Sequence, residues 1–517
     1  MKQTIEVTLL PSSAYDDDLI KQIIASELRV LPQDITAIKK LRRSLDARSK
    51  QPIYKLLAEV FINENPPVES PEVVYNPITS NKTAHIVGFG PAGMFAALQF
   101  IELGIKPIVF ERGKTVRDRR FDLKNIMQDH IVNPDSNYCF GEGGAGTYSD
   151  GKLYTRATKR GNVKKILRVL VQHGASEDIL VDAHPHIGSN KLPNIIEAIR
   201  NTILRCGGEI HYNSKITNMI IKDNHITGVV VNNTDEHPVQ SLILATGHSA
   251  RDIYSLLDSK KIFIEAKPFA VGVRIEHPQQ LINEMQYHTS ENNPLLPPAS
   301  YNLSCQAGEK GVFSFCMCPG GIIVPASTGA DELVINGMSV SKRDSAFANS
   351  GFVVSVNEKD FAPFAKAGAL AGLHYQQAIE HKAFLAGGSR QTAPAQRVTD
   401  FLNNVVSSTL PKSSYIPGIV SYDVAAIFPE AVVASLREGL LTSNKKMRGY
   451  ITDEAQILAA ETRTSSPVRI TRDKESGMHV QIQGLFPAGE GAGYAGGIVS
   501  AAIDGELAAE AVAKFLR

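Results

Sequence analysis

Two cysteines separated by one residue, Cys316 and Cys318, have a spacing that could support redox chemistry. On a β-strand, residues i and i+2 point to the same face, so the two thiols would lie side by side, toward a bound cofactor. The spacing differs from the Cys-x-x-Cys of thioredoxin-like proteins, and no further zinc ligands lie nearby in sequence. The pair therefore predicts either a redox dithiol or two small buried residues beside a Pro-Gly-Gly turn.

Several other side chains could act as acid–base groups or anion clamps. His186, in a His-Pro-His run, and His248 could each serve as a general base near neutral pH. Arg274 could bind a substrate carboxylate through two parallel hydrogen bonds, and Arg463 and Arg469 could do the same. The favoured alternative for His186 and for the arginines is a structural or salt-bridge role, and the sequence predicts no metal site.

The stretch His85–Gly104 must position this chemistry. A short apolar run leads into Gly88, Gly90 and Gly93, spaced Gly-x-Gly-x-x-Gly, and an alanine-rich helical pattern follows. The glycines suit a tight turn, close approach of a pyrophosphate and close packing of helix on strand. A second apolar run ends at Glu111, where an acid receives a ribose hydroxyl. The pattern predicts a dinucleotide-binding βαβ unit rather than an ordinary one.

Three more glycine-containing turns lie along the chain. The cluster within Phe140–Lys152 suits a backbone that approaches a ligand closely, with a flexible surface loop as the alternative. Ser241–Gly247 is predicted to be a buried strand ending in a turn, which should lie near the first glycine turn if both strands share one sheet. Gly484–Glu490 is a further strand and turn, and an alanine-rich helix follows it to the end.

Composition narrows the class of protein. The chain has 517 residues, a formal net charge of +1 and five cysteines. The charge balance makes a nucleic acid an unlikely partner, and the few, odd-numbered cysteines fit a reducing compartment. There is no signal-peptide pattern and no apolar run long enough to span a bilayer. We therefore expect a cytoplasmic protein without a membrane partner.

The N-terminal residues predict a separate small domain. Gln3–Leu10, Asp34–Lys39 and Ile53–Phe61 have strand patterns, and Asp17–Leu31 has a helical one. The basic run Lys39–Lys50 could bind an anion or RNA. We interpret it instead as the solvated face of a hairpin, because no aromatic residues are interspersed with the charges.

Three of these turns, in this order, resemble the glutathione-reductase-type FAD-binding fold: Gly88–Gly93, Ala245–Gly247 and Pro487–Glu490 before a helix. More narrowly, the chain is similar to the uncharacterised family of FAD-dependent dehydrogenases that carry a small N-terminal domain. This narrower likeness covers nearly the whole chain and rests on Phe140–Leu153, Phe315–Gly321 and Arg463–Pro467.

The resemblance implies FAD as the cofactor. Glu111 would bind the adenosine ribose, the backbone of Ile216 would meet the adenine, and Glu490 would bind the ribityl chain. The last helix would begin at the N1–C2=O edge of the flavin, where its positive dipole end favours the reduced state. The implied cofactor contacts are Gly88, Gly90, Pro91, Ala92, Gly93, Glu111, Arg112, Gly143, Gly144, Ala145, Gly146, Thr147, Ile216, Ala245, Thr246, Gly247, Gly489, Glu490, Gly496, Gly497 and Ile498.

The resulting fold class is α/β, with a Rossmann-like FAD-binding domain that is split in sequence. We predict a small α+β domain over 1–75 and a linker over 76–83. The FAD-binding domain follows over 84–266 and resumes over 449–517, and an inserted α+β substrate domain occupies 267–448.

These parts predict an FAD-dependent oxidoreductase, a dehydrogenase or reductase, that transfers hydride between a small organic substrate and the flavin. The sequence contains one dinucleotide fingerprint, so any further electron donor or acceptor would be external. Alternatives are an FAD-dependent monooxygenase, an RNA-associated flavoprotein that uses the N-terminal domain, and a flavin-binding redox sensor without turnover. Cys316, Cys318, His186 and Arg274 are the candidate catalytic residues.

Overall fold

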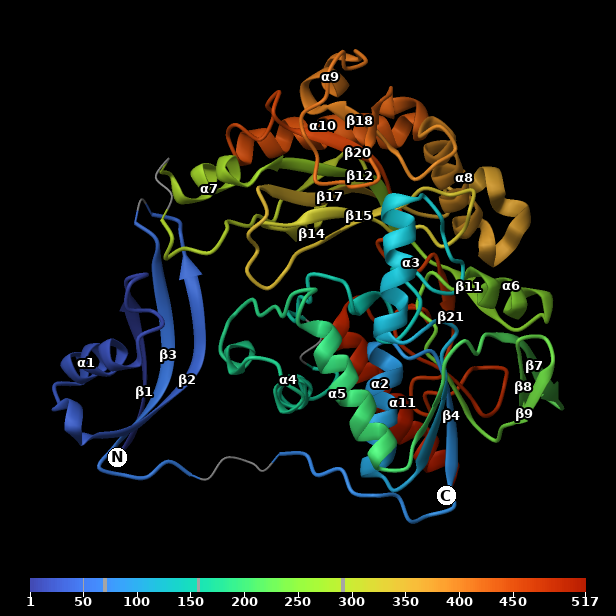
Figure 1. Ribbon diagram of the computed structural model, residues 1–517, viewed down its shortest axis with the longest axis horizontal. Coiled ribbons are helices and arrows are strands. Elements are labelled where there is room, and N and C mark those ends of the chain that lie inside the picture. The colour runs from blue at the N-terminus through green and yellow to red at the C-terminus, as the bar shows by residue number, and fades with distance from the viewer. Residues whose placement is uncertain (50, 68–71, 156–158, 290–292) are drawn as a thin grey trace.

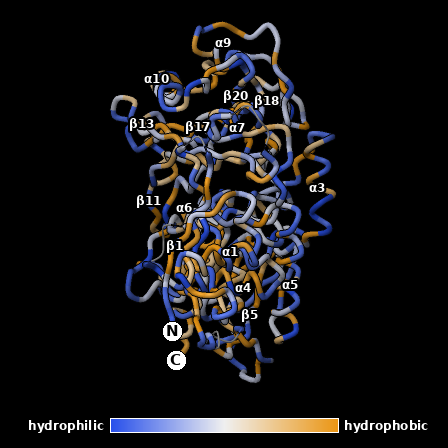
Figure 2. Tube along the Cα trace, turned by 90° about the vertical axis from the view of Figure 1, so that its left-hand side faces the viewer, coloured by the Kyte–Doolittle hydropathy of each residue, from blue (hydrophilic) through white to orange (hydrophobic). Residues whose placement is uncertain are grey.

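A computed structural model describes residues 1–49, 51–67, 72–155, 159–289 and 293–517. The fold is mixed α/β. A parallel sheet forms its lower half in Figure 1, a large mainly antiparallel sheet forms its upper half, and the N-terminal domain lies to one side. Both termini lie at the end opposite the antiparallel sheet, as the view turned by 90° in Figure 2 also shows. Among the described residues, every helix is too short or too polar to cross a lipid bilayer.

The N-terminal domain is a three-stranded antiparallel sheet, ordered β1-β3-β2, with one helix packed on it. The helix starts where the Asp16 carboxylate accepts the backbone N–H groups of Asp18 and Leu19, both at 3.0 Å. Strand β2 continues beyond its predicted end at Lys39 because it pairs with β3 along the whole hairpin. The elements are β1 (Lys2–Leu9), α1 (Asp17–Leu28), η1 (Pro32–Asp34), β2 (Ile35–Asp46) and β3 (Ile53–Ile62).

Arg43, in the basic run of β2, corrects the prediction of a solvated hairpin face. Its side chain is buried and donates to Asp182 and Asp178, both at 2.9 Å, while it stacks under the ring of Tyr15. The N-terminal domain therefore docks on the parallel-sheet domain through this arginine. Lys50, the end of the predicted run, lies outside the described residues.

The segment that follows the N-terminal domain joins the parallel-sheet domain earlier than predicted. Tyr75 is buried and packs with Val73 and Ile78 in the core of that domain, and the Ile78 N–H donates to the Cys206 carbonyl. The predicted domain end at residue 75 is thus too late. Residues 68–71, near the end of the predicted domain, lie outside the described part of the chain.

The parallel sheet has the strand order β22-β10-β4-β5-β6 within the described residues. Ile86, Val109 and Ile243 face the helices on one side, and Val87 and Leu244 face a small antiparallel meander on the other. The strands that lead into the first, third and last glycine turns thus share one sheet, which is the condition under which the turn after β10 was expected to lie near the first glycine turn. The strands are β4 (Thr83–Val87), β5 (Lys106–Phe110), β6 (Glu209–His211), β10 (Leu242–Leu244) and β22 (Leu485–Pro487), and the meander is β7 (Ile216–Lys222), β8 (His225–Val231) and β9 (Asp235–Pro238).

Helices α2 and α11 pack closely against each other beside the parallel sheet (Figure 1). A Cβ added to Gly505 of α11 would lie 2.0 Å from the Ala92 carbonyl oxygen of α2, so only glycine fits there. The helices of this half are α2 (Pro91–Glu102), α3 (Val116–Gln128), α4 (Val163–Gln172), α5 (Leu192–Arg205), α6 (Arg251–Ser259) and α11 (Ile498–Phe515), with η2 (Gly144–Gly146) and η3 (Glu177–Leu180).

The second large sheet has seven strands in the described residues, in the order β13-β14-β17-β12-β20-β18-β19. Strand β12 lies at its centre and is buried along nearly its whole length. Helices α8 and α10 cover the outer face (Figure 1). The elements are β12 (Phe269–Pro278), β13 (Ser304–Ala307), β14 (Lys310–Cys318), β17 (Phe347–Val356), β18 (Ala393–Arg397), β19 (Ile419–Ser421), β20 (Gln456–Glu461), α7 (Gln279–Tyr287), α8 (Ala371–Ala386), α9 (Val398–Asn403), α10 (Glu430–Lys446), η4 (Ala362–Leu370) and η5 (Val424–Ile427).

The chain leaves the second sheet later than predicted. Strand β20 pairs antiparallel with both β12 and β18, so the inserted part extends beyond residue 448. Two short two-stranded ribbons connect the halves. They are β11 (Ile264–Ala266) with β21 (Val468–Ile470), and β15 (Ile322–Pro325) with β16 (Ile335–Met338).

Candidate functional site

A cavity of about 1000 Å³ lies between the two sheets. On one side it is bounded by the carboxyl ends of β4, β5, β10 and β22 and by the first turns of α2 and α11. On the other side it reaches β14 and β16 of the second half, through Phe315, Cys316 and Asn336. Ligands of open α/β folds bind at this edge of the sheet, so the cavity is the candidate site.

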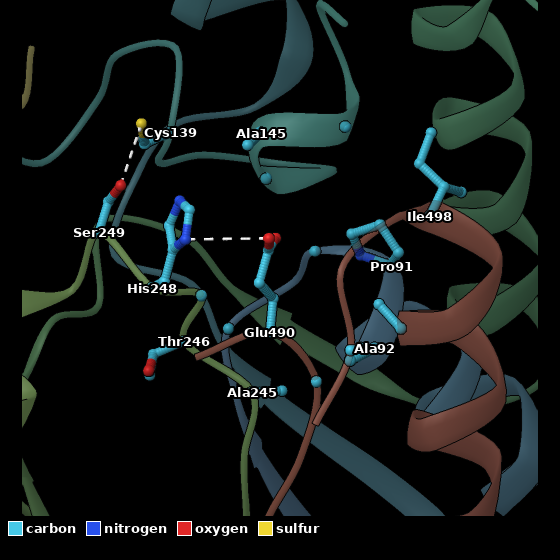
Figure 3. A pocket seen from close by; sticks show the side chains of 18 of the residues that line it. Pro91, Ala92, Cys139, Ala145, Ala245, Thr246, His248, Ser249, Glu490 and Ile498 are labelled. Atoms are coloured by element: carbon cyan, nitrogen blue, oxygen red, sulfur yellow. Dashed lines mark hydrogen bonds and ion pairs between the residues drawn. The ribbon is translucent and has the colours of Figure 1, made fainter. Parts of the chain in front are cut away.

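The three fingerprint glycines occupy different environments at the α2 end of the cavity. Gly88 has φ +98°, and a Cβ there would lie 2.4 Å from the Ala245 carbonyl oxygen. A Cβ on Gly93 would lie 1.9 Å from the Gly88 carbonyl oxygen, so this glycine packs helix on turn behind the cavity. Gly90 lines the cavity, together with Pro91 and Ala92 (Figure 3). The N-terminus of α2 therefore opens into the cavity.

Glu111 and Arg112 lie at the far end of this cavity wall, after β5. The Glu111 carboxylate accepts the backbone N–H groups of Phe89, Gly113 and Gly141 at 2.8, 2.9 and 3.0 Å. The Arg112 guanidinium pairs with Asp135 and Asp252 and stacks on the Phe140 ring. These contacts hold the two turns together, and they leave the carboxylate capacity for a further donor. Ile216 lines the same end of the cavity.

The glycine-rich loop is ordered by a buried arginine that the sequence interpretation did not identify. Arg119 of α3 donates to the backbone carbonyls of Asn137, Tyr138, Glu142 and Gly144 at 2.6 to 3.0 Å. Gly144, Ala145 and Gly146 line the cavity as a result. Gly143 and Thr147 lie behind the wall, since the Thr147 hydroxyl bonds to the Glu142 carbonyl and is fully buried. These two residues therefore do not reach a ligand directly.

His248 and Glu490 face each other across the middle of the cavity (Figure 3). The His248 Nδ1 and Glu490 Oε1 atoms are 3.8 Å apart, and Nδ1 has no hydrogen-bond partner within the described residues. Burial, together with Arg463 and Arg251, lowers the pKa of His248 to about 3, and burial raises the pKa of Glu490 to about 7. The pair is therefore a neutral imidazole beside a carboxyl group that holds a proton near neutral pH, not an ion pair.

The turn before His248 and the turn around Glu490 complete this wall. Ala245, Thr246 and Gly247 follow β10, and Gly489 follows β22, so the parallel register places these turns side by side. Gly496, Gly497 and Ile498 line the cavity at the N-terminus of α11. A Cβ on Gly247, Gly496 or Gly497 would meet no atom of the described residues within 4 Å, so each opens into free space.

The two candidate thiols do not point to one face. The register of β14 shifts between Phe315 and Cys318, and Cys316 adopts a left-handed conformation with φ +45°. Cys316 therefore lines the cavity, whereas Cys318 is fully buried behind it. Lys152 of the glycine-rich loop reaches both sulfur atoms, with Nζ at 3.7 Å from Cys316 Sγ and 3.8 Å from Cys318 Sγ.

Arg274 is fully buried, so the prediction that it clamps a substrate is wrong. Its guanidinium binds Glu461 through two hydrogen bonds of 2.8 and 3.0 Å and donates to Asn349 at 2.7 Å. His186 does not line the cavity either: its Nε2 atom lies 3.2 Å from the Ser341 carbonyl oxygen. Burial, reinforced by Arg343, lowers the pKa of His186, so this imidazole is a neutral structural contact.

The arginines after β20 are also largely engaged by protein groups. Arg463 lies on the cavity wall but is buried between Glu332 and Glu380. Arg469 stacks over the Tyr494 ring. Neither presents a bidentate face to the cavity, because two carboxylates already bind the Arg463 guanidinium and Arg469 is not among the residues that line the cavity.

Comparisons with known proteins agree with this picture. An uncharacterized protein of Clostridium beijerinckii is 40% identical over 521 residues, which cover 96% of each chain. The chain belongs to the family of this clostridial protein. A family model described as FAD-dependent protein, C-terminal domain-like, matches residues 268–464 of this chain. A model of a domain of unknown function matches its residues 1–61. The cofactor is FAD, and the protein is a flavoprotein with a Rossmann-type nucleotide-binding half.

Solved structures show a more distant likeness to this chain. A geranylgeranyl bacteriochlorophyll reductase-like protein of Thermoplasma acidophilum is 12% identical, with 84% of this chain and 79% of that chain covered and a TM-score of 0.35. A glycerol-3-phosphate dehydrogenase of Bacillus halodurans complexed with FAD is 11% identical, with 85% and 66% covered and a TM-score of 0.36.

Two observations of the structure show that the cavity fits FAD. The glycines at 247, 496 and 497 leave room where any side chain would protrude, and the volume admits a ligand of this size. The buried His248 Nδ1 atom also lacks a partner among the described residues, which a bound polar group would supply. Residues of both halves line the cavity, and the second half is the part that the FAD-dependent family model matches, 268–464.

Proposed function

We propose that this protein is an oxidoreductase of the glutathione-reductase-type FAD-binding fold. It transfers hydride between a small organic substrate and FAD in the cavity between its two halves. One observation carries the proposal: a single continuous cavity connects the dinucleotide-binding turn at α2 with the α11 N-terminus and with Cys316 on the second sheet. A cofactor bound along the α2 turn and the α11 N-terminus would present its reacting end to Cys316.

The proposed binding mode uses backbone groups on one side. The N-terminus of α2 and the backbone of the glycine-rich loop offer N–H groups to the pyrophosphate, and Gly90 lets the pyrophosphate approach. The ribose and adenine lie toward Glu111 and Ile216. The open glycines 496 and 497 receive the edge of the flavin ring, where the dipole of α11 stabilises negative charge.

Glu490 and His248 supply a proton site in the proposed mechanism. Burial raises the pKa of Glu490 to about 7, so its carboxyl can hold or release a proton under ordinary conditions. His248 remains neutral beside it and can accept that proton's hydrogen bond through Nδ1. When bound, FAD supplies the hydride chemistry. The protein residues orient the reactants, move protons and exclude water.

The second half supplies the proposed substrate side. Asn302 and Asn336 line the cavity beside Phe315 and Cys316, and these side chains offer amide and thiol groups next to an aromatic surface. Such a lining suits a small organic molecule with at least one polar group. Because the sequence contains one dinucleotide fingerprint, a nicotinamide donor would have to bind transiently rather than in a domain of its own.

An absorbance spectrum followed by anaerobic titration tests the proposal. The purified protein should show flavin bands near about 370 and 450 nm, and one class of reductant should bleach the band at about 450 nm. A colourless protein that takes up no added FAD would overturn the cofactor placement. Rapid, saturable reduction of the flavin by NADPH alone would show instead that a bound nicotinamide nucleotide, not an external organic substrate, delivers the hydride.

A further inference from the structure

The contacts around Cys316 and Cys318 differ from those of ordinary buried cysteines. Lys152 Nζ lies within 3.8 Å of both sulfur atoms and also bonds to the Met317 carbonyl. The Cys318 thiol donates a hydrogen bond to the Cys316 carbonyl oxygen at 3.3 Å and also interacts with the Cys316 sulfur. The two thiols and one ammonium group therefore form a compact cluster.

The backbone at Cys316 departs from that of a regular strand. Residues i and i+2 of a strand are about 6.6–6.8 Å apart at Cα, which is the upper limit for a disulfide. The register shift and the left-handed φ at Cys316 interrupt this regular spacing, and Cys316 lines the cavity. A non-glycine residue held in this conformation is costly, and such residues are concentrated at functional sites.

The charges around the cluster favour one thiolate. The hydrogen bond from Cys318, then Lys152 and Arg274, hold the pKa of Cys316 well below its ordinary value, while the same hydrogen bond and burial raise the pKa of Cys318. Burial opposes the charge on Lys152, but the two sulfurs raise its pKa overall. The remaining charged groups nearby are Asp150, which pairs with Arg343, and Glu461, which pairs with Arg274.

We propose that Cys316 and Cys318 form a redox-active dithiol that exchanges with low-molecular-weight disulfides entering the cavity. Cys316 is the attacking thiolate, Cys318 the resolving thiol, and Lys152 the positioning residue. This assignment names a substrate class for the site and so rests on the proposed function. It differs from the alternative of two inert core cysteines, because Cys316 faces the cavity and a cation bridges the pair.

The exchange balances in two steps. Cys316 attacks one sulfur of the substrate, so a bond between Cys316 and that sulfur forms, the substrate S–S bond breaks and the first thiol leaves with a proton from solvent. The Cys318 thiol then loses its proton to the second leaving sulfur and attacks Cys316. The Cys316–Cys318 disulfide forms and the second substrate thiol departs. The protein dithiol is oxidised and the substrate disulfide is reduced by two electrons. Reduced FAD, when bound, would supply the two electrons and two protons that restore the dithiol.

Mass spectrometry of the reduced, FAD-loaded full-length protein tests this directly. With bis(2-hydroxyethyl) disulfide as the probe, the wild type should lose two hydrogen masses, release two mercaptoethanol molecules per chain and yield a linked Cys316–Cys318 peptide. Cys318→Ser should stop at a mixed disulfide on Cys316, and Cys316→Ser should give neither product. Cys305→Ser, which changes a thiol outside the cavity lining, is the matched control and should behave as the wild type.

Lys152 variants provide a readout that a merely structural lysine would not change. Lys152→Met should slow alkylation of Cys316 by iodoacetamide about tenfold at pH 7, corresponding to about one unit in the thiol pKa, and the rate should recover at high pH. Lys152→Arg should restore most of the rate at pH 7. The fraction of bound flavin, measured at about 450 nm, shows whether each variant still binds the cofactor.

Two results would overturn the inference. One is a wild-type mixed disulfide at Cys316 that Cys318 never resolves, and the other is a Cys316 alkylation rate no faster than that of Cys305. If flavin binding and its reduction by another compound class persist in these cases, the oxidoreductase proposal stands and only the dithiol assignment fails. If the protein binds no flavin while disulfide exchange proceeds, the dithiol assignment stands and the oxidoreductase proposal fails.

Discussion

Glu490 and His248 show how one buried environment separates the protonation of two neighbouring groups. The carboxyl retains a proton up to about pH 7, and the imidazole stays neutral down to about pH 3, although their atoms are 3.8 Å apart. Desolvation disfavours both charged forms, and the arginines nearby disfavour a second positive charge. A proton can therefore be stored at Glu490 beside the cofactor cavity.

The raised pKa of Glu490 predicts a stability effect with a defined sign. The folded carboxyl binds its proton more tightly than the unfolded one, whose value is 4.5, so the stability this proton contributes is complete below about pH 4.5 and is lost as the pH rises through about 7. Glu490→Gln cannot ionise. Its melting temperature should therefore exceed that of the wild type at pH 8 and match it near pH 4.5.

Thermal unfolding of both proteins across this range, with and without bound flavin, measures the effect. Glu27→Gln, which changes an exposed carboxyl, is the control and should show no such pH dependence. Equal differences between Glu490→Gln and the wild type at pH 4.5 and pH 8 would contradict the assignment.

Arg274 is predicted to be a stability residue rather than a binding residue. Arg274→Met would leave the buried Glu461 carboxylate without its cation, which typically costs about 3–5 kcal/mol. The double variant Arg274→Met/Glu461→Leu removes both charges and should recover much of that loss. Thermal and urea unfolding curves of the single and double variants measure this. A single variant as stable as the wild type would contradict the prediction.

At the scale of elements, the contact between α2 and its glycine turn predicts different roles for two glycines. A Cβ on Gly93 would lie 1.9 Å from the Gly88 carbonyl oxygen, so Gly93→Ala must displace helix or turn and should lower both the melting temperature and the flavin content. Gly496→Ala adds the same methyl group where it meets no described atom within 4 Å. It should fold normally and weaken flavin binding by about tenfold, or 1.4 kcal/mol.

Melting curves and flavin titrations of these two variants separate packing from binding. If Gly93→Ala retained a normal melting temperature, the tight α2 packing would be wrong. Gly496→Ala with wild-type flavin affinity would indicate that the flavin does not reach the α11 N-terminus.

At the scale of the whole molecule, Arg43 connects the N-terminal domain to the rest. Arg43→Ala removes charged hydrogen bonds to Asp178 and Asp182, worth about 1.5–3 kcal/mol, but leaves the backbone bonds from Arg43 N–H to Val181 and from Ala183 N–H to Arg43. The interface should open more often without unfolding either domain. Hydrogen exchange should therefore accelerate at 178–183 and along β2.

Arg42→Ala is the matched control, since Arg42 is the exposed neighbour in the same strand. Its exchange pattern should equal that of the wild type. Unchanged exchange at 178–183 in Arg43→Ala would show that the backbone pairing alone holds the domain.

Much of the fold follows from local rules that a sequence expresses directly. The apolar runs before Gly88, Glu111, Gly247 and Gly489 predicted four strands of the parallel sheet, and the glycine spacing at 88, 90 and 93 predicted a strand–turn–helix unit with three distinct glycine environments. These features depend on residues a few positions apart, so their spacing specifies them. The N-terminal domain was likewise recognisable, except that the length of β2 depends on its partner strand.

The site itself depends on contacts between residues far apart in the chain. Arg43 and Asp182 are separated by 139 positions, Lys152 and Cys316 by 164, and Arg274 and Glu461 by 187. An arginine that clamps a ligand and one that neutralises a buried glutamate have the same sequence pattern. Strand alternation also predicts two equivalent thiols, and the bulge at Cys316 that makes them unequal arises from pairing with β17. Residue spacing thus determined the cofactor-binding scaffold, whereas burial and long-range pairing decided which side chains remain available for chemistry.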